Sequence, residues 1–248
     1  MAKNGKLGLL LAALVVLSLG SGVQAGEQCT KATLEGHYGI IQNGTFFGRG
    51  LFGGVGVITF DGEGNRELAA TQVFEDTGVR YVTSSPGTYT VTAGCTGSSA
   101  TIDGGSTQDF VIVDGGRELR VIGTMDDRVV TWIVKKQRLE SCTNATIGGR
   151  YGLTLNGKIQ GRGLAGAVGS LTFDGEGRAS YAATAVYEDT GLDHVILEGK
   201  YTVNPNCTGS LLLGASATFD FVIVGEGEEI FQIATRSDRV VTWTMKKQ

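Results

Sequence analysis

One apolar stretch occurs twice in the chain and constrains the fold more than any other feature. Leu51–Gly64 reads LFGGVGVITFDGEG, and Leu164–Gly177 reads LAGAVGSLTFDGEG, 113 positions later. Each stretch is a β-branched run that ends in Phe-Asp-Gly-Glu-Gly, which is typical of a strand that leads into a tight turn. The chain therefore contains a duplication, and both copies should fold in the same way.

The duplication extends over almost all of the chain after its first segment. Copy one runs from Cys29 to about Gln137, and copy two runs from Cys142 to Gln248. Two single-residue deletions in copy two correspond to Val82–Gly87 and Cys95–Thr107 of copy one, and such deletions are tolerated in turns. A period near 112 residues is that of a whole domain and is too long for a solenoid repeat. We therefore predict one domain over residues 26–138 and a second over 139–248.

The composition favours an all-β fold for both copies. The chain has 40 glycines and 2 prolines among 248 residues, without a Gly-X-Y period. Turn signals such as Asp61-Gly62 and Thr77-Gly78 separate about eight β-rich runs in each copy, and no stretch has the period of a helix. We predict two tandem antiparallel domains of about eight strands each, as small up-and-down β-barrels, because closure removes sheet edges. β-Sandwiches are the alternative.

The segment Met1–Ala25 has the features of a secretory signal peptide. Two lysines precede the apolar run Leu7–Gly20, and Val23-Gln24-Ala25 provides a small-residue cleavage site. The run is shorter than the roughly 20 residues that span a membrane. We expect cleavage near Ala25 and a secreted or periplasmic protein that does not span the membrane afterwards. An uncleaved anchor is the alternative.

The charge of the chain argues against nucleic acid as a partner. The net charge is −4, and no basic stripe or cluster is present in the sequence. Nucleic-acid-binding domains usually concentrate Lys and Arg on one face. A mildly acidic surface contributes mainly to solubility.

The four cysteines fit an oxidising compartment. Four cysteines allow three pairings, but the duplication selects one, because each copy should carry its own bridge. We predict the disulfides Cys29–Cys95 and Cys142–Cys207. Each would close a loop of about 66 residues, which is worth roughly 4 kcal/mol in the loop-entropy model. Zinc ligation is the rival interpretation, but the C-x-x-C spacing and a shared His are both missing.

Several short motifs together resemble a known group of proteins. Each copy has G-x-Y-G (Gly36–Gly39 and Gly149–Gly152), then T-F-D-G-x-G, G-x-Y-T-V before C-T-G, D-F-V-I-V and a closing V-V-T-W. This order resembles a family of exported bacterial β-repeat proteins, and the resemblance implies export and a β unit but no chemistry. The G-x-Y opening is also similar to the G-x-W opening of lipocalins. Allene oxide cyclase and dirigent barrels are a further comparison of fold alone.

The candidate ligand-binding residues are aromatic or charged groups at equivalent places in the two copies. Trp132 and Trp243 stand in the closing strand of each copy, where a Trp either lines a pocket or plugs a barrel end. Asp109 and Asp220 precede Phe-Val-Ile-Val, and we expect them to point inward and to pair with a nearby arginine. The full set of candidates is Tyr38, Tyr151, Arg49, Arg162, Asp109, Asp220, Trp132 and Trp243.

The two copies also differ at one loop. Phe46-Phe47 of copy one corresponds to Ile159-Gln160 of copy two. If these loops border a barrel mouth, the copies differ in apolar exposure there and in the ligand or partner that they accept.

The acidic turns and histidines give little support to metal binding or catalysis. The turn Asp61–Gly64 offers two carboxylates, whereas calcium takes six to eight oxygens, so a hairpin turn is the better interpretation. His37 and His194 have no histidine counterpart in the other copy. No G-x-S-x-G, H-E-x-x-H or phosphate-binding loop is present. We predict no metal and no cofactor.

Three classes of function fit this sequence. We favour an exported, non-catalytic protein that binds a small apolar ligand, or an envelope or extracellular partner, because a barrel of eight strands can hold one small ligand. An isomerase or cyclase that uses carboxylate and Tyr groups in a barrel mouth is the first alternative. A structural envelope protein with filled barrels is the second. A cavity of about 300 Å³ or more would favour ligand binding, and an inward carboxylate with a raised pKa would favour the enzyme.

Overall fold

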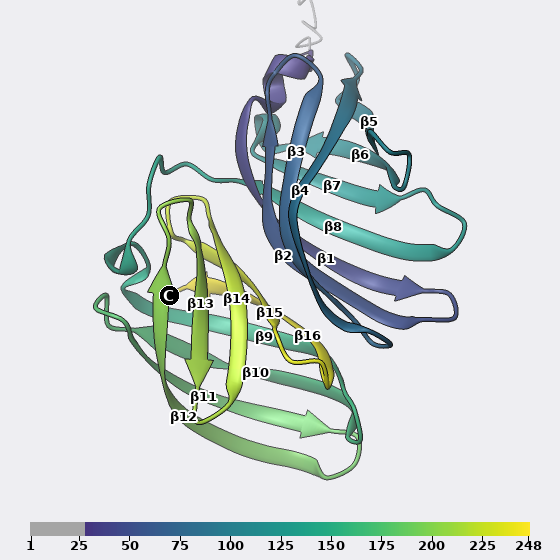
Figure 1. Ribbon diagram of the computed structural model, residues 1–248. Coiled ribbons are helices and arrows are strands. Elements are labelled where there is room, and N and C mark those ends of the chain that lie inside the picture. Colours follow the sequence, from purple (N-terminus) through teal and green to yellow (C-terminus); the bar gives the residue numbers. More distant parts are fainter. Residues whose placement is uncertain (1–27) are drawn as a thin grey trace, which may run out of the picture.

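The computed structural model describes residues 28–248, which form two closed antiparallel barrels of eight strands each (Figure 1). In both barrels every strand pairs with its neighbours in sequence, and the last strand closes on the first. The prediction of two eight-stranded barrels is confirmed, and the sandwich alternative is wrong. The predicted signal peptide lies outside the described residues.

Barrel 1 contains the first eight strands and two short 3-10 helices. Side chains alternate between the interior and the outer face, as the period of two in a strand requires. The helix η1 (Lys31–Leu34) precedes the first strand, and η2 (Asp114–Gly116) lies between the sixth and seventh. The strands are β1 (Gly36–Phe46), β2 (Gly50–Phe60), β3 (Asn65–Phe74), β4 (Gly78–Val91), β5 (Thr96–Thr101), β6 (Thr107–Val113), β7 (Glu118–Gly123) and β8 (Arg128–Lys136).

Barrel 2 follows the same order of elements. The 3-10 helix η3 (Asn144–Ile147) precedes its first strand, as η1 does in barrel 1. Corresponding strands pair in corresponding registers, so positions in the two barrels can be equated one by one. The strands are β9 (Gly149–Ile159), β10 (Gly163–Phe173), β11 (Arg178–Tyr187), β12 (Gly191–Val203), β13 (Thr208–Leu213), β14 (Ala217–Val224), β15 (Glu229–Ala234) and β16 (Arg239–Lys247).

The motif Phe-Asp-Gly-Glu-Gly forms a turn that its own aspartate stabilises. Asp61 Oδ1 accepts the backbone N–H groups of Glu63 (2.8 Å), Gly64 (2.9 Å) and Asn65 (2.9 Å). The side chain of Asn65 also donates to Asp61, and these hydrogen bonds hold the pKa of the Asp61 carboxyl well below its usual range. Gly62 has a φ of 79°, which only glycine adopts without strain. The carboxylate of Asp61 therefore serves to stabilise the turn.

One end of each barrel is plugged, and a disulfide secures the plug. In barrel 1 the fully buried Leu34 of η1 packs with Tyr38, Phe60 and Tyr89. The disulfide Cys29–Cys95 ties the segment before η1 to the β4–β5 turn. The disulfide Cys142–Cys207 does the same before η3 in barrel 2, and both are the pairings expected from the sequence. Two disulfides fit a location outside the cytoplasm. Among residues 28–248, no helix is long and apolar enough to cross a membrane.

The two barrels pack against each other through a separate apolar cluster. Strand β2 contacts β14, β15 and β16, and β1 contacts β14 and β15. The glycine at position 39 allows this close approach, since a Cβ there would lie 2.3 Å from Cγ1 of Val224. The buried members of the cluster are Ile41, Val55, Val73, Val222, Val224, Phe231, Ile233 and Val240.

Asp220 lies in this interface and should make stability depend on pH. It faces barrel 1, where Thr71 Oγ1 donates to its Oδ2 at 2.7 Å, and burial raises the pKa of its carboxyl above 3.8. The folded state therefore favours the protonated form, and stability should fall as pH rises from below 3.8 through the raised pKa. An Asp220→Asn variant should lose this dependence and be the more stable protein at neutral pH. Urea unfolding of both proteins at a series of pH values measures the difference.

The matched control is Asp109→Asn, because Asp109 occupies the equivalent position in barrel 1 and is exposed there. This variant should follow the wild-type pH profile when both are measured at low protein concentration. If the stability of the wild type and of the Asp220→Asn variant changed with pH in the same way, the pKa of Asp220 would be the same in the folded and unfolded states. That result would contradict the prediction.

Candidate functional site

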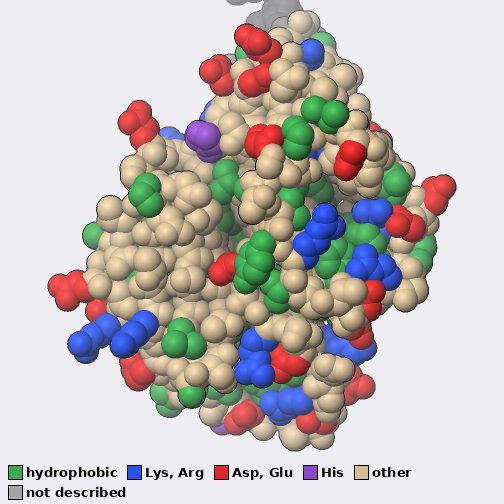
Figure 2. Space-filling model, in the orientation of Figure 1, with side chains coloured by type: hydrophobic (Ala, Val, Ile, Leu, Met, Phe, Trp, Pro, Cys, Tyr) green, Lys and Arg blue, Asp and Glu red, His purple; other side chains and the backbone are tan. Residues whose placement is uncertain are grey.

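Barrel 1 contains a cavity of about 390 Å³ that opens to the surface at the end opposite η1. Figure 2 shows the hollow on the right of the molecule, with hydrophobic side chains inside it and basic side chains around it. The alternation of side chains sends residues from all eight strands into this space. The volume exceeds the 300 Å³ above which a pocket commonly holds a small ligand.

Aromatic side chains form the apolar part of the cavity near its mouth. The rings of Phe46, Phe52 and Phe74 contact one another, with centroids 4.9–5.3 Å apart. Trp132 of β8 packs against this group and also lines the cavity. Aromatic rings in such contact give a rigid apolar wall.

Two arginines at the rim stack on the aromatic wall. The guanidinium of Arg49 lies 4.4 Å from the ring centroid of Phe74, and that of Arg128 lies 4.3 Å from that of Phe46. Arg49 also pairs with Asp76 at 2.8 Å, and Arg128 pairs with its neighbour in sequence, Asp127. These two rim cations are therefore compensated by carboxylates.

Arg66 is different, because it is a buried cation without a carboxylate partner. It projects from β3 into the barrel with 4% of its surface exposed. Its Nε donates to Ser99 Oγ at 3.1 Å, and its Nη1 donates to the carbonyl of Ser85 at 2.9 Å. No described carboxylate lies within ion-pair distance of it. Burial lowers the pKa of Arg66, but a guanidinium remains charged at neutral pH.

A glycine on the neighbouring strand makes room for this guanidinium. A Cβ at Gly87 would lie 2.5 Å from Cζ of Arg66. A buried charge with neutral partners costs free energy unless something compensates it. Arg66 therefore gives the inner wall of the cavity a positive charge that no ion pair compensates, although the more distant carboxylates of Glu67 and Asp103 act on it.

Three glutamines extend the polar wall around Arg66. Gln72 Nε2 donates to Gln42 Oε1 at 3.2 Å, and Gln108 Nε2 donates to Ser106 Oγ at 2.5 Å. Gln42 and Gln108 are buried. Each amide retains hydrogen-bonding capacity beyond these bonds, since a primary amide has two N–H groups and a carbonyl oxygen. The cavity thus combines an aromatic mouth with a polar, cationic wall.

The carboxylates that line the cavity, Asp103 and Asp127, do not have the properties of catalytic acids. The pKa of Asp103 is lowered by hydrogen bonds from Thr101 and from the backbone, and the pKa of Asp127 is lowered by its contact with Arg128. Both carboxyls are therefore ionised at neutral pH. Within residues 28–248 no group of three or more His, Cys, Asp and Glu side chains is placed to hold a metal ion.

Barrel 2 is largely apolar inside and nearly full, although the buried Gln232 of β15 also faces inward and its amide has no hydrogen-bond partner among the described residues. Its cavity measures about 110 Å³, and Tyr181 and Phe219 pack on Trp243 with ring centroids 5.3 and 4.7 Å away. The registers show that seven polar residues of the inner wall of barrel 1 have apolar counterparts here. These counterparts are Leu155 for Gln42, Ala179 for Arg66, Ala185 for Gln72, Leu197 for Ser85, Leu211 for Ser99, Leu213 for Thr101 and Phe219 for Gln108.

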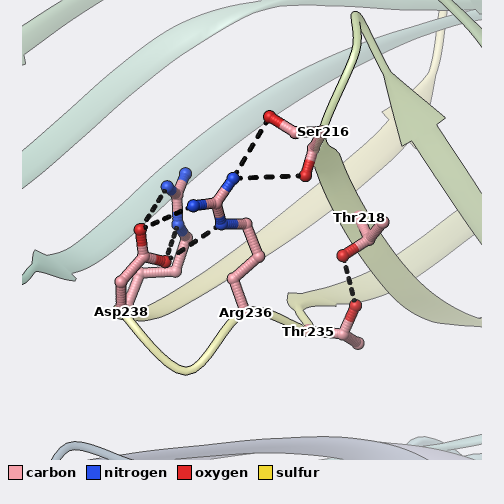
Figure 3. Close-up of polar contacts among 6 residues, drawn as sticks. Ser216, Thr218, Thr235, Arg236 and Asp238 are labelled. Atoms are coloured by element: carbon pink, nitrogen blue, oxygen red, sulfur yellow. Dashed lines mark hydrogen bonds and ion pairs between the residues drawn. The ribbon is translucent and has the colours of Figure 1, made fainter.

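Polar contacts join two turns at the mouth of barrel 2, as Figure 3 shows. Arg236 donates from Nη1 to Ser216 Oγ at 3.1 Å, which joins the β15–β16 turn to the β13–β14 turn. Asp238 pairs with Arg236 at 3.1 Å and with Arg239 at 2.8 Å, and hydrogen bonds from Arg239 first and Arg236 second lower the pKa of Asp238 to about 2. The equivalent of Arg236 in barrel 1 is Met125, which cannot form this tie. The mouths of the two barrels therefore differ.

The predicted tryptophans and arginines lie at the cavities, with one tryptophan and one arginine in each barrel. Trp132 lines the cavity of barrel 1, and Trp243 lines that of barrel 2. Arg49 lies at the rim of barrel 1. Arg162 lies at the equivalent rim of barrel 2, where it stacks over Tyr187 at 3.7 Å.

The predicted tyrosines lie at the plugged ends and line neither cavity. Tyr38 donates to the carbonyl of Gly116 at 2.7 Å, and Tyr151 donates to that of Gly227 at 2.5 Å. Burial raises the pKa of both phenols. Their contacts secure the plugs.

The expected inward orientation of Asp109 and Asp220 is wrong. Asp109 is exposed on the outer face of barrel 1, and Asp220 points from barrel 2 to Thr71. Neither forms an ion pair with an arginine of the described chain. In barrel 1, Arg49 and Arg128 pair with Asp76 and Asp127, and in barrel 2 their equivalents Arg162 and Arg239 pair with Asp189 and Asp238. The inward residues beside them are Gln108 and Phe110 in β6, and Phe219 and Phe221 in β14.

Sequence reasoning missed Arg66 and the three glutamines. One signal was available: Arg66 aligns with Ala179, and Gln42, Gln72 and Gln108 also align with apolar residues. In this protein, the polar residues at these inward positions line the larger cavity.

Comparisons with known proteins find only distant likeness. No family model and no curated protein matches the chain. A DUF3598-family protein of unknown function from Nostoc punctiforme has 7% identity and a TM-score of 0.28, covering 89% of this chain and 100% of its own. The structure of CghA with Sch210972 has 6% identity and a TM-score of 0.26, covering 85% and 88%. A candidate AttH from Nitrosomonas europaea has 9% identity and a TM-score of 0.27, covering 94% and 98%. At these scores the likenesses carry no argument about function.

Proposed function

We propose that barrel 1 binds one small amphipathic molecule that carries an anionic group, and that barrel 2 serves as its support. The observation that carries this proposal is the buried, unpaired guanidinium of Arg66 in the wall of an open 390 Å³ cavity. The anionic group lies against Arg66, and the apolar part lies against Phe46, Phe52, Phe74 and Trp132. From the sequence we expected a mostly apolar ligand, and we now propose a ligand that also has a charged end.

The electrostatics of the cavity support an anion over a neutral ligand. Four arginines and two aspartates line it, so the lining has an excess of positive charge. Two of the arginines are already paired at the rim, whereas Arg66 is not. A planar guanidinium binds carboxylate, sulfonate or phosphate oxygens through two parallel hydrogen bonds. An anion there would offset the cost of burying Arg66.

The likeness to lipocalins noted in the sequence points in the same direction, since barrels of eight strands can hold one small ligand. We propose further that binding takes place outside the cytoplasm, in keeping with the two disulfides and the leader expected at Met1–Ala25. The protein is then a carrier or sensor for such a molecule, and its chemistry is binding alone.

Two matched fluorescent probes test this proposal. 1-Anilinonaphthalene-8-sulfonate is an amphipathic anion, and N-phenyl-1-naphthylamine is the same ring system without the sulfonate. The Arg66→Met variant should lose about tenfold to a hundredfold in affinity for the sulfonate, because a hydrogen bond to a charged group is worth about 1.5–3 kcal/mol. Its affinity for the neutral probe should be unchanged or higher. Fluorescence titration of both probes measures the two constants.

Two controls accompany the titration. An Arg120→Gln variant removes a cation from the outer face of barrel 1 and should bind both probes like the wild type. Unfolding in urea shows whether the Arg66→Met variant is folded, and it should be at least as stable as the wild type, because a lone buried charge has been removed. Equal losses for both probes, or no loss for either, would contradict the proposal.

A further inference from the structure

The interface between the two barrels joins two different faces, and this has consequences for the whole molecule. We call the outer face of β1–β4 in barrel 1, and its equivalent on β9–β12 in barrel 2, face A. We call the outer face of β14–β16 in barrel 2, and its equivalent on β6–β8 in barrel 1, face B. Face A of barrel 1 packs on face B of barrel 2. Such a heterologous contact leaves one face A and one face B of each chain unused.

The unused face A, on barrel 2, keeps the apolar residues that the used face buries. In barrel 1, Val55, Val73 and Val79 belong to the cluster between the barrels. The registers place Val168, Val186 and Leu192 at the same positions in barrel 2, where their exposed fractions are 61%, 54% and 65%.

The unused face B, on barrel 1, also keeps apolar residues that are buried on the used face B. In barrel 2, Val222, Ile233 and Val240 are buried against barrel 1. Their equivalents on barrel 1 are Val111, Ile122 and Val129, which are 39%, 48% and 56% exposed. Large apolar side chains gathered on an exposed face usually mark a binding surface.

Two of the polar pairs that cross the interface have equivalents on the unused faces. The first is Thr71 with Asp220, 2.7 Å apart. Thr184 on the unused face A and Asp109 on the unused face B are the equivalents of these two residues.

A second pair, Asn43 with Thr242 at 2.6 Å, has the equivalents Asn156 and Thr131. One member of each of these two equivalent pairs lies on each unused face, so the two faces are complementary at these positions.

A glycine gives a further sign of a close approach. A Cβ at Gly53 would lie 3.0 Å from the side chain of Thr242 across the interface. The equivalent residue in barrel 2 is Gly166, and a Cβ there would meet no atom of the described chain nearer than 3.8 Å. The fold of one chain therefore gives no steric reason for glycine at position 166.

We propose that a second copy of this chain docks here, with face A of barrel 2 in one molecule bound to face B of barrel 1 in the next. The contact repeats the internal arrangement and produces head-to-tail oligomers. It is weaker than the internal contact. Phe231 and Ile41 are replaced by Arg120 and Thr154 at the equivalent positions, and the covalent link that raises the effective concentration of the two barrels is missing. Assembly therefore depends on protein concentration.

Analytical ultracentrifugation of the purified protein tests the proposal through complementary variants. The wild-type protein should gain mass as its concentration rises. Val168→Glu blocks face A of barrel 2, and Ile122→Glu blocks face B of barrel 1, so each variant alone should remain monomeric. An equimolar mixture should form a one-to-one dimer and nothing larger, since one free face A and one free face B remain.

The matched control is Ile102→Glu, which changes a 72% exposed side chain outside both faces and should assemble like the wild type. Thermal unfolding confirms that each variant is folded. A wild-type protein that stays monomeric at every concentration would overturn the proposal. So would a Val168→Glu or Ile122→Glu variant that still associates alone, or a mixture of the two that forms no dimer.

Discussion

Replacing Phe231 with alanine will destabilise the protein by about 3–5 kcal/mol, the usual cost of truncating a fully buried phenylalanine. Phe231 lies on the outer face of β15, and its exposed fraction is 0% because barrel 1 covers it. The surrounding strands belong to two closed barrels and cannot move in to fill the space. The variant should therefore also uncouple the barrels, so that one unfolding transition becomes two. Calorimetry measures both effects.

The duplication supplies a matched control for this substitution. Arg120 occupies the equivalent position in barrel 1, on a face that the chain leaves exposed. Its ion pair with Glu118 is at the surface, where such pairs are worth at most about 1 kcal/mol. The free energy of unfolding should therefore fall at least three times as much in the Phe231→Ala variant as in the Arg120→Ala variant. Equal effects of the two variants would show that the interface contributes little to folding.

Removing the disulfide of barrel 2 will cost roughly 4 kcal/mol. Cys142 and Cys207 close a loop of 65 residues, and loop closure of this size restricts the unfolded chain by about that amount. Both cysteines are also buried, at 2% and 3% exposure, so their replacement by alanine removes packing as well. The double variant Cys142→Ala/Cys207→Ala should show an early transition for barrel 2. Denaturant unfolding followed by circular dichroism and calorimetry detects it.

The comparison is the double variant Cys29→Ala/Cys95→Ala, which opens a loop of 66 residues in barrel 1. The entropic loss should be the same, but these cysteines are less buried, so the total loss should be smaller. A loss below about 1 kcal/mol in both double variants would contradict the expected contribution of loop closure.

Much of the fold could be predicted from the sequence because it depends on local patterns. The repeated glycine-rich turns mark the strand ends, and alternation along the strands implies one buried face. The turn at Asp61–Gly64 was correctly expected to be a hairpin, and its aspartate binds three backbone N–H groups. Closure into barrels follows from many short strands in sequential order.

The orientation of Asp220 could not be predicted from such patterns. Strand β14 is apolar on both faces, because Phe219, Phe221 and Ile223 fill the barrel while Val222 and Val224 pack on barrel 1. Alternation identifies the inner face only when the other face meets water. The contact between the barrels removed that contrast, and the inward orientation predicted for Asp220 was wrong for this reason.

The sequence by itself determined most of the strand and turn positions, the doubling of the barrel and the expected pairing of the cysteines, because each depends on residue type and spacing along the chain. The exception is Val82–Gly87, where the deletion in copy two suggested a turn: this segment lies inside β4, and a bulge opposite Leu68 and Ala70 accommodates the extra residue. Only the tertiary structure decided that barrel 1 is hollow and barrel 2 nearly full, and which outer faces meet. A cavity is what remains after side chains from eight strands have filled a shared space. Arg66, Gln42 and Gln108 come together there from strands that are distant in sequence.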